Sequence, residues 1–357
     1  MKKKEKKKFI RKNLRYRNIG IRDLEKFEDD EIIEEKRAEK KVKEKGEISL
    51  KSDLQLTSGK VLNVHSNYRI LVEIEGKNIE CTLSGRLKQI NFETRNVIAV
   101  GDIVNVQLSK PSRIEEILPR ENALSRFAED SFQTEIIVAA NIDQVIITTS
   151  VKEPYLKLGL IDRYICSALL GNIEPIICVN KIDLEEDIKA LKEIMNFYRE
   201  NGYKIIYTSA FNKNSILDLK KILKNKESVF SGHSGTGKSS LINLLQPGLN
   251  LRVSNVSSYT KKGAHTTTSS SLIKWDFGGY LIDTPGIKTF SLHKNHIYDL
   301  PKVFPGFDKY IDYCKFPDCT HTHEKNCAVK NAIENGEFPE ERYDSYLNIY
   351  DSLKDLS

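Results

Sequence analysis

The stretch ESVFSGHSGTGKSSLINLL, residues 227–245, decides the fold. Glycines spaced through its centre let successive backbone N–H groups converge on phosphate oxygens at the start of the helix that follows, which is typical of a phosphate-binding loop. In that arrangement Lys238 reaches the terminal phosphates and is a catalytic candidate, and the Ser239 hydroxyl ligates Mg²⁺. The residues predicted to surround the phosphates are Gly232, His233, Ser234, Gly235, Thr236, Gly237, Lys238, Ser239 and Ser240.

Two loops earlier in the chain predict that the base is guanine. Asn180-Lys181-Ile182-Asp183 follows the buried strand PIICV, and the Asp183 carboxylate can accept hydrogen bonds from N1–H and the 2-amino group of guanine. Adenine lacks both donors and would leave the carboxylate unpaired, which discriminates strongly against it. The turn Thr208-Ser209-Ala210 ends the next strand, and Ser209 and Ala210 are weaker candidates for contacting the base through their backbone.

Two loops after residue 245 predict the Mg²⁺ and γ-phosphate contacts. Asp283-Thr284-Pro285-Gly286 follows the strand at 280–282, so that Asp283 holds Mg²⁺ through water and the Gly286 N–H contacts the γ-phosphate. The polar segment Lys262–Thr268 contains three threonines, one of which supplies a second Mg²⁺ hydroxyl. Spacing alone does not show which of the three threonines ligates Mg²⁺, and we take Thr267 as the candidate.

The order of these motifs predicts a circular permutation. In ordinary GTPases the motifs occur in the order phosphate loop, switch threonine, DxxG, NKxD and SA. In this chain NKxD is the first of these motifs and DxxG is the last. The surrounding pattern alternates strands and helices, which favours a parallel sheet covered on both sides, with ligands beyond the carboxyl ends of its strands. The expected elements are a strand at 136–150 buried on both faces, helices at 156–170 and 185–200, and strands at 175–179 and 204–210.

The region from residue 55 to about 118 predicts a small β-barrel. Apolar residues alternate in YRILVEIEG, NIECTLS and DIVNVQL, with turn signals between them and no intervening long helix. An OB-type barrel and an SH3-like barrel both fit this periodicity.

Charge and composition restrict the class of protein. The 357 residues are 39% hydrophobic and 30% charged, no run reaches the roughly 18 apolar residues of a membrane span, and a cytoplasmic location is expected. The net charge of +6 is concentrated in residues 1–20, where ten Lys or Arg face a single acid, Glu5. A basic arm of this kind suits a polyanion, although a solvated tail has the same composition. Residues 21–50 indicate a solvated helix or linker, and no heptad pattern suggests self-association, so a monomer is expected.

Three of the six cysteines predict a metal site. Cys314, Cys319 and Cys327 occur within fourteen residues together with His321. Three thiolates and one imidazole suit tetrahedral Zn²⁺, and four protein ligands leave no open position, so the site is structural. His323 competes with His321 as the fourth ligand by spacing.

From about residue 55 to 340 the sequence resembles the circularly permuted GTPases that assist late assembly of the small ribosomal subunit, the RsgA or YjeQ family. The resemblance rests on the motifs above and on VGD at 100–102, IxPR at 117–120 and AANIDQ at 139–144. It implies an OB-fold that contacts ribosomal RNA, His321 as the zinc ligand, and stimulation of GTP hydrolysis by the 30S subunit. The expected division is a charged extension (1–50), an OB barrel (51–125), the permuted GTPase (126–293) and a helical zinc subdomain (294–357).

The position after Gly286 predicts slow intrinsic hydrolysis. Many GTPases place a water-orienting Gln there, and this chain has Ile287, whose side chain cannot position water. The resemblance implies the same apolar residue in the family, with the subunit stimulating hydrolysis and hydrolysis releasing the factor. His265 and His233 are candidates for replacing the glutamine within the chain. Two other functions remain open: an RNA-binding protein that senses guanine nucleotides without hydrolysis, and a P-loop ATPase, which Asp183 disfavours.

Overall fold

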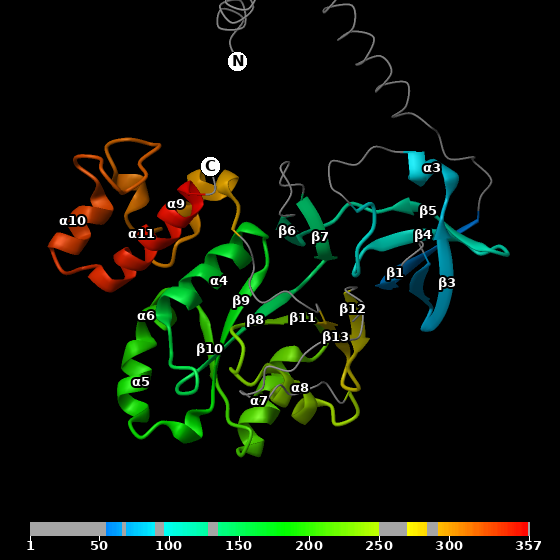
Figure 1. Ribbon diagram of the computed structural model, residues 1–357, viewed down its shortest axis with the longest axis horizontal. Helices are drawn as coiled ribbons and strands as arrows, with labels where there is room; N and C mark the ends of the chain where they lie inside the picture. The colour runs from blue at the N-terminus through cyan, green and yellow to red at the C-terminus, as the bar shows by residue number, and fades with distance from the viewer. Residues whose placement is uncertain are drawn as a thin grey trace, which may run out of the picture. The chain divides into compact units, whose positions relative to one another are not determined.

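The computed structural model describes residues 55–65, 69–89, 96–127, 135–249, 270–283 and 292–355 (Figure 1). All elements below belong to one compact unit, Leu56–Ser357. The basic arm, the threonine loop with His265 and Thr267, and Gly286 and Ile287 lie outside the described residues. Within the described ranges, no helix has the length and apolar character that crossing a membrane requires.

Five strands and a short helix form the predicted barrel. They are β1 (Leu56–Val64), β2 (Ile70–Ile74), β3 (Lys77–Leu83), α3 (Gly85–Gln89), β4 (Ile103–Gln107) and β5 (Ser112–Ile117). The strands pair in the order β1-β2-β3-β5-β4, and an additional pairing of β1 with β4 closes the ring. The alternating Ile70, Val72 and Ile74 are buried in its core. The closed five-stranded ring confirms the OB-type prediction.

The GTPase sheet has the order β10-β9-β8-β11-β13-β12. Neighbouring strands from β10 to β13 are parallel, and β12 pairs with β13 in the antiparallel sense. The carboxyl ends of β9, β10, β11 and β13 therefore meet at one edge, where the predicted motifs follow them. The strands are β8 (Gln144–Ser150), β9 (Glu174–Asn180), β10 (Lys204–Tyr207), β11 (Lys226–Ser231), β12 (Ser271–Lys274) and β13 (Gly279–Asp283).

Helices connect consecutive strands of this sheet from β8 to β11, as the alternating pattern of the sequence predicts. Strand β8 is buried on both faces, since Ile146 and Ile147 belong to different hydrophobic clusters. The predicted helix at 185–200 is wrong as a single element, because the chain turns at Met195 between two short helices. The helical elements are α4 (Leu158–Leu170), η2 (Ile182–Leu184), α5 (Ile188–Ile194), α6 (Asn196–Glu200), α7 (Lys213–Leu223) and α8 (Lys238–Leu245).

The apolar run 136–150 is also two elements rather than one. Its first part, β7 (Glu135–Ala140), pairs antiparallel with β6 (Ala123–Phe127) in a separate two-stranded ribbon. Only β8 enters the parallel sheet. The break lies at Asn141, whose backbone has φ of 54°, a left-handed conformation that a continuing strand does not adopt.

The C-terminal elements pack around an aromatic core beside α4. Phe304, Phe307, Phe338 and Tyr346 are buried in it, with the rings of Phe307 and Tyr346 4.7 Å apart. The elements are η3 (Lys294–Tyr298), α9 (Leu300–Val303), η4 (Ile311–Tyr313), α10 (Ala328–Glu334) and α11 (Glu340–Lys354).

A buried ion pair joins α11 to α4. Arg342 Nη1 donates to Asp162 Oδ2 at 2.8 Å, and the Tyr198 hydroxyl donates to the other carboxylate oxygen at 2.6 Å. Asp162 is fully buried, and burial raises the pKa of its carboxyl although Arg342 opposes the change. Nothing in the local sequence marks these residues as partners, because 180 positions separate them.

We expect Arg342→Ala to lower the free energy of unfolding by about 3–5 kcal/mol, because Asp162 keeps its burial and loses its counter-charge. Chemical denaturation followed by circular dichroism measures the change. Lys204→Ala is the matched control, since Lys204 and Glu174 form an exposed pair that contributes about 0–1 kcal/mol. Equal losses in the two variants would contradict the stabilising role of the buried pair.

The barrel meets the GTPase sheet at β12. Asn63 of β1 lies opposite Ser271 of β12, and Ser271 lies opposite Asp283 of β13. Glu73 of the barrel accepts hydrogen bonds from Lys274, at 2.7 Å, and from the Tyr280 hydroxyl. The barrel is therefore attached to the hairpin that separates the threonine loop from the DxxG motif.

Candidate functional site

The phosphate loop connects β11 to α8 in the predicted context. Two of its glycines are required by close approaches: a Cβ on Gly232 would lie 2.0 Å from the Thr148 carbonyl oxygen, and one on Gly237 would lie 2.3 Å from Asn180 Nδ2. Both have positive φ, of 146° and 91°. Helix α8 begins at Lys238, and the N–H groups of a first helical turn have no partners within the helix. The loop can thus offer several amides to an anion.

Lys238 folds back over this loop. Its Nζ donates to the carbonyl oxygens of Gly232 and His233 at 2.6 and 2.8 Å, and burial lowers its pKa. The ammonium group thus lies over the loop, where phosphate oxygens can exchange with the two carbonyls as its partners. His233, the second histidine candidate for orienting water, is part of the same loop. Its side chain is exposed, and its Nδ1 lies 3.0 Å from the Ser234 carbonyl oxygen.

Hydrogen bonds connect the phosphate loop to the two predicted guanine loops. Asn180 Nδ2 donates to the Thr236 carbonyl at 2.9 Å, and its Oδ1 accepts from the Thr208 hydroxyl at 3.0 Å. The Ile182 N–H donates to the Thr208 carbonyl at 3.2 Å. Asn180 is buried, and these two hydrogen bonds hold the NKxD loop to the phosphate loop and to the loop that follows β10.

Asp183 has an exposed side chain in the segment that follows β9. Asp183 lies in η2, a short helix that begins directly after Lys181, and Lys181 has a left-handed backbone with φ of 60°. The Asp183 side chain is exposed at the carboxyl edge of the sheet. Ser209 is buried and Ala210 is exposed beside it. Of the residues predicted for the guanine loops, Asn180 contacts the phosphate loop directly, and the segments that carry Asp183, Ser209 and Ala210 follow β9 and β10 at the same edge of the sheet.

The two Mg²⁺ candidates lie on different elements of the GTPase domain. Asp283 ends β13, next to β11, and Ser239 lies in the first turn of α8. Burial raises the pKa of the Asp283 carboxyl, a cost that a bound divalent cation would offset. A carboxylate and a hydroxyl are oxygen donors of the kind that Mg²⁺ takes in proteins.

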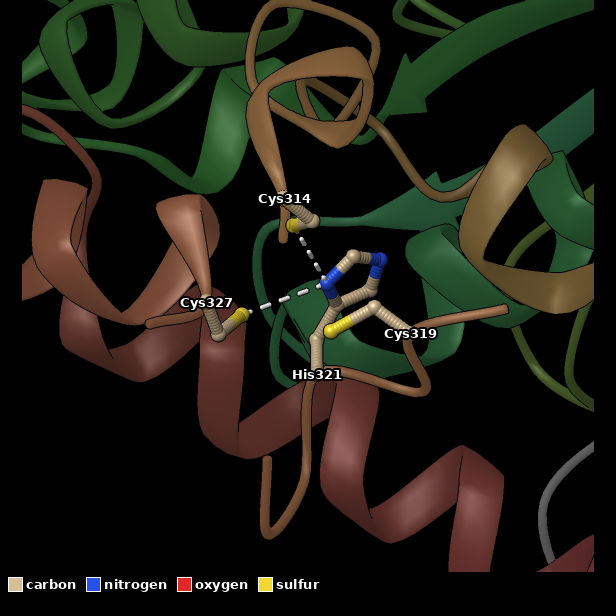
Figure 2. Close-up of side chains that lie close together, drawn as sticks. All are labelled: Cys314, Cys319, His321 and Cys327. Atoms are coloured by element: carbon tan, nitrogen blue, oxygen red, sulfur yellow. Dashed lines mark hydrogen bonds between the residues drawn. The ribbon is translucent and has the colours of Figure 1, made fainter. Parts of the chain in front are cut away.

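The cysteine cluster is assembled as the spacing predicts. Figure 2 shows the three sulfurs around the ring of His321, whose Nδ1 lies 3.5 Å from Cys314 Sγ and 3.3 Å from Cys327 Sγ. The ligand atoms of Cys314, Cys319, His321 and Cys327 all lie within 4.8 Å of one another. His323 is exposed and its Nδ1 contacts the Thr322 hydroxyl instead, so it does not join the cluster.

The chemistry of this cluster fits Zn²⁺. Burial raises the pKa of Cys319 to about 12 and also raises the pKa of Cys327, so these two buried thiols need a nearby cation to become thiolates. The ring of Phe307 contacts His321 edge-on, with centroids 5.4 Å apart, and fixes its plane. Soft sulfur with one nitrogen is a Zn²⁺ donor set, and the four groups fill a tetrahedral shell.

Glu324 organises the loop on both sides of His321. Its carboxylate accepts from the Thr320 N–H at 2.7 Å, the Thr320 hydroxyl at 2.6 Å and the Thr322 N–H at 3.0 Å. Burial alone would raise its pKa, but these hydrogen bonds outweigh it and lower the pKa to about 2. The sequence analysis missed this residue, and the only signal was an acid between two cluster positions.

The sheet order and the motifs on it define a circularly permuted P-loop GTPase, preceded by an OB-type barrel and followed by a helical subdomain with a zinc-type cluster. The profile of the RsgA GTPase domain matches residues 117–293. The chain belongs to the RsgA GTPase family.

Several curated proteins and solved structures are similar to this chain over most of its length. The small ribosomal subunit biogenesis GTPase RsgA of Thermotoga petrophila is 39% identical over 302 residues, covering 83% of this chain and 96% of the relative. That of Flavobacterium psychrophilum is 35% identical, covering 82% and 92%. The crystal structure of YjeQ from Thermotoga maritima is 35% identical with a TM-score of 0.67, covering 84% of this chain and 98% of that one. The structure of YloQ, a circularly permuted GTPase, has a TM-score of 0.65 at 28% identity, covering 87% and 99%.

Proposed function

We propose that this protein is a GTP hydrolase that binds the small ribosomal subunit, assists its late maturation and leaves it after hydrolysis stimulated by the subunit. The observation that carries the proposal is the convergence of the guanine loops and the phosphate loop on one sheet edge, joined through Asn180. The printed names of the relatives supply the partner. A cytoplasmic, monomeric protein is part of the same proposal.

The roles of the site residues follow from their positions. Asp183 reads guanine, Ser209 and Ala210 contact the base through the backbone, and residues 232–240 surround the phosphates. Lys238 neutralises charge that develops on the terminal phosphates, and catalysis of phosphoryl transfer rests mainly on such positioning and electrostatics. Mg²⁺ supplies further neutralisation when bound, with Ser239 and Asp283 as its protein partners. Gly286, Thr267 and His265 keep the roles predicted from the sequence.

The remaining parts of the proposal concern RNA. The OB-type barrel and the zinc subdomain contact ribosomal RNA, and the arm at residues 1–20 adds a basic tether. Zn²⁺ would be held by Cys314, Cys319, His321 and Cys327, where it stabilises the subdomain without taking part in hydrolysis. The proposed divisions of the chain remain those drawn from the sequence, at residues 50, 125 and 293.

Steady-state hydrolysis of GTP and ATP, with and without purified small subunits, tests the proposal. We expect slow release of phosphate from GTP alone, a stimulation of at least tenfold by the subunits, and no turnover of ATP. Large subunits at equal concentration are the control for nonspecific RNA effects. Binding of GTP without stimulated hydrolysis would favour a nucleotide sensor, and equal turnover of ATP would contradict the role of Asp183.

A further inference from the structure

Phe211 is the most exposed of the large hydrophobic side chains in the described part of the chain. Its side chain is 88% exposed, although full burial of a Phe stabilises a protein by about 1.5–3 kcal/mol. Within the described part of the chain, no aromatic ring or cation packs on the Phe211 ring. Its exposure therefore has no explanation in the packing of this chain.

Position connects Phe211 with the guanine loops. It directly follows Ala210 in the segment between β10 and α7, and β10 lies parallel to β9 with Tyr207 opposite Val179. The next residues of these strands, Thr208 and Asn180, are joined by the hydrogen bond described above. Phe211 is thus three residues beyond a contact that fixes the NKxD motif.

The backbone that carries Phe211 is well fixed. The Phe211 N–H donates to Ser209 Oγ at 3.1 Å, and the Asn212 N–H donates to the Ser209 carbonyl at 3.1 Å. Asn212 caps α7 by accepting from the N–H groups of Asn214 and Ser215. An exposed ring on a fixed turn loses little conformational entropy when a flat ligand stacks on it.

We propose that Phe211 forms an aromatic wall of the nucleotide site and stacks on the guanine ring whose edge Asp183 reads. The inference rests on the proposed function and adds a base-contacting residue to it. Stacking is indifferent to the ring substituents that separate guanine from other purines, so Phe211 contributes affinity while Asp183 contributes selectivity.

Isothermal titration of the full-length protein with GDP, inosine diphosphate and inorganic triphosphate tests this role. We expect Phe211→Ala to weaken GDP binding roughly 5- to 150-fold, the range expected for one stacked base, and to weaken inosine diphosphate binding by the same factor. Affinity for triphosphate, which has no base, should stay unchanged. Phe211→Tyr should retain most of the affinity for GDP.

Leu217→Ala is the matched control, because Leu217 is also exposed but lies on α7, beyond the loop. Phe211→Trp adds an optical readout: its fluorescence should change with GDP and not with triphosphate, whereas the only native tryptophan, Trp275, is buried. Unchanged GDP affinity of Phe211→Ala, or equal losses for GDP and triphosphate, would overturn the inference. Unchanged GDP affinity with weaker binding to small subunits would assign Phe211 to the partner surface instead. Wild-type protein that binds no GDP would refute the proposed function itself.

Discussion

Lys238→Ala should reduce the rate of GTP hydrolysis roughly 100- to 1,000-fold, with and without small subunits, because the site loses its only phosphate-loop cation. In the structure the Lys238 ammonium is held over the loop by the carbonyls of Gly232 and His233. It is therefore placed before nucleotide arrives and needs little reorganisation. Phosphate release under single-turnover conditions measures the chemical step directly.

Lys213→Ala is the control for this variant, since Lys213 is an exposed lysine at the start of α7 and belongs to none of the nucleotide motifs. It should hydrolyse GTP at the wild-type rate. Binding of GDP should weaken much less than hydrolysis in Lys238→Ala, because the β-phosphate retains the backbone amides of the loop. A normal turnover rate in Lys238→Ala would remove this residue from the catalytic site.

Cys327→Ser should abolish binding of zinc and unfold most of the C-terminal subdomain. A structural zinc site contributes on the order of 10 kcal/mol to the fold that holds it, and Cys327 stands at the start of α10, in the buried core. We expect one equivalent of zinc in the wild type, none in the variant, and rapid proteolysis between residues 292 and 355. Metal analysis and limited proteolysis measure both effects.

His323→Ala separates loss of a ligand from local damage. His323 lies two residues from His321 and outside the cluster, so this variant should keep its zinc and resist proteolysis. The GTPase part of Cys327→Ser should still bind GDP, because its motifs follow the strands of the parallel sheet and none of them belongs to the cysteine cluster. Retention of a full equivalent of zinc by Cys327→Ser would show that the metal is held by a different set of residues.

Local patterns predicted the elements that carry chemistry. Gly232 and Gly237 mark the phosphate loop because their conformations and close contacts admit no side chain. Such a steric requirement can be predicted from the sequence, because only glycine satisfies it. Alternating burial in β2 and the spacing of the cysteines are equally local. The OB assignment needed the resemblance to a family, since periodicity does not show which strands pair.

Long-range partnerships were beyond the sequence. The ion pair of Asp162 and Arg342 depends on two helices meeting, and the split of residues 136–150 depends on β7 finding β6 instead of the main sheet. No sequence motif pointed to Glu324 or Phe211. Glu324 acts through three contacts to backbone and hydroxyl groups, and Phe211 is a single residue outside the motifs. The sequence assigns the candidate site, and only packing shows what supports it.

The attachment of β1 to β12 also bears on solubility. In the GTPase sheet β12 is the last strand, and an uncovered last strand offers its free N–H and C=O groups to any other extended chain. Here Asn63 occupies the position beside Ser271, and Lys274 adds a charge near the other end, neutralised by Glu73. In the folded protein the barrel thus covers the start of this edge strand, which reduces the backbone open to edge-to-edge pairing.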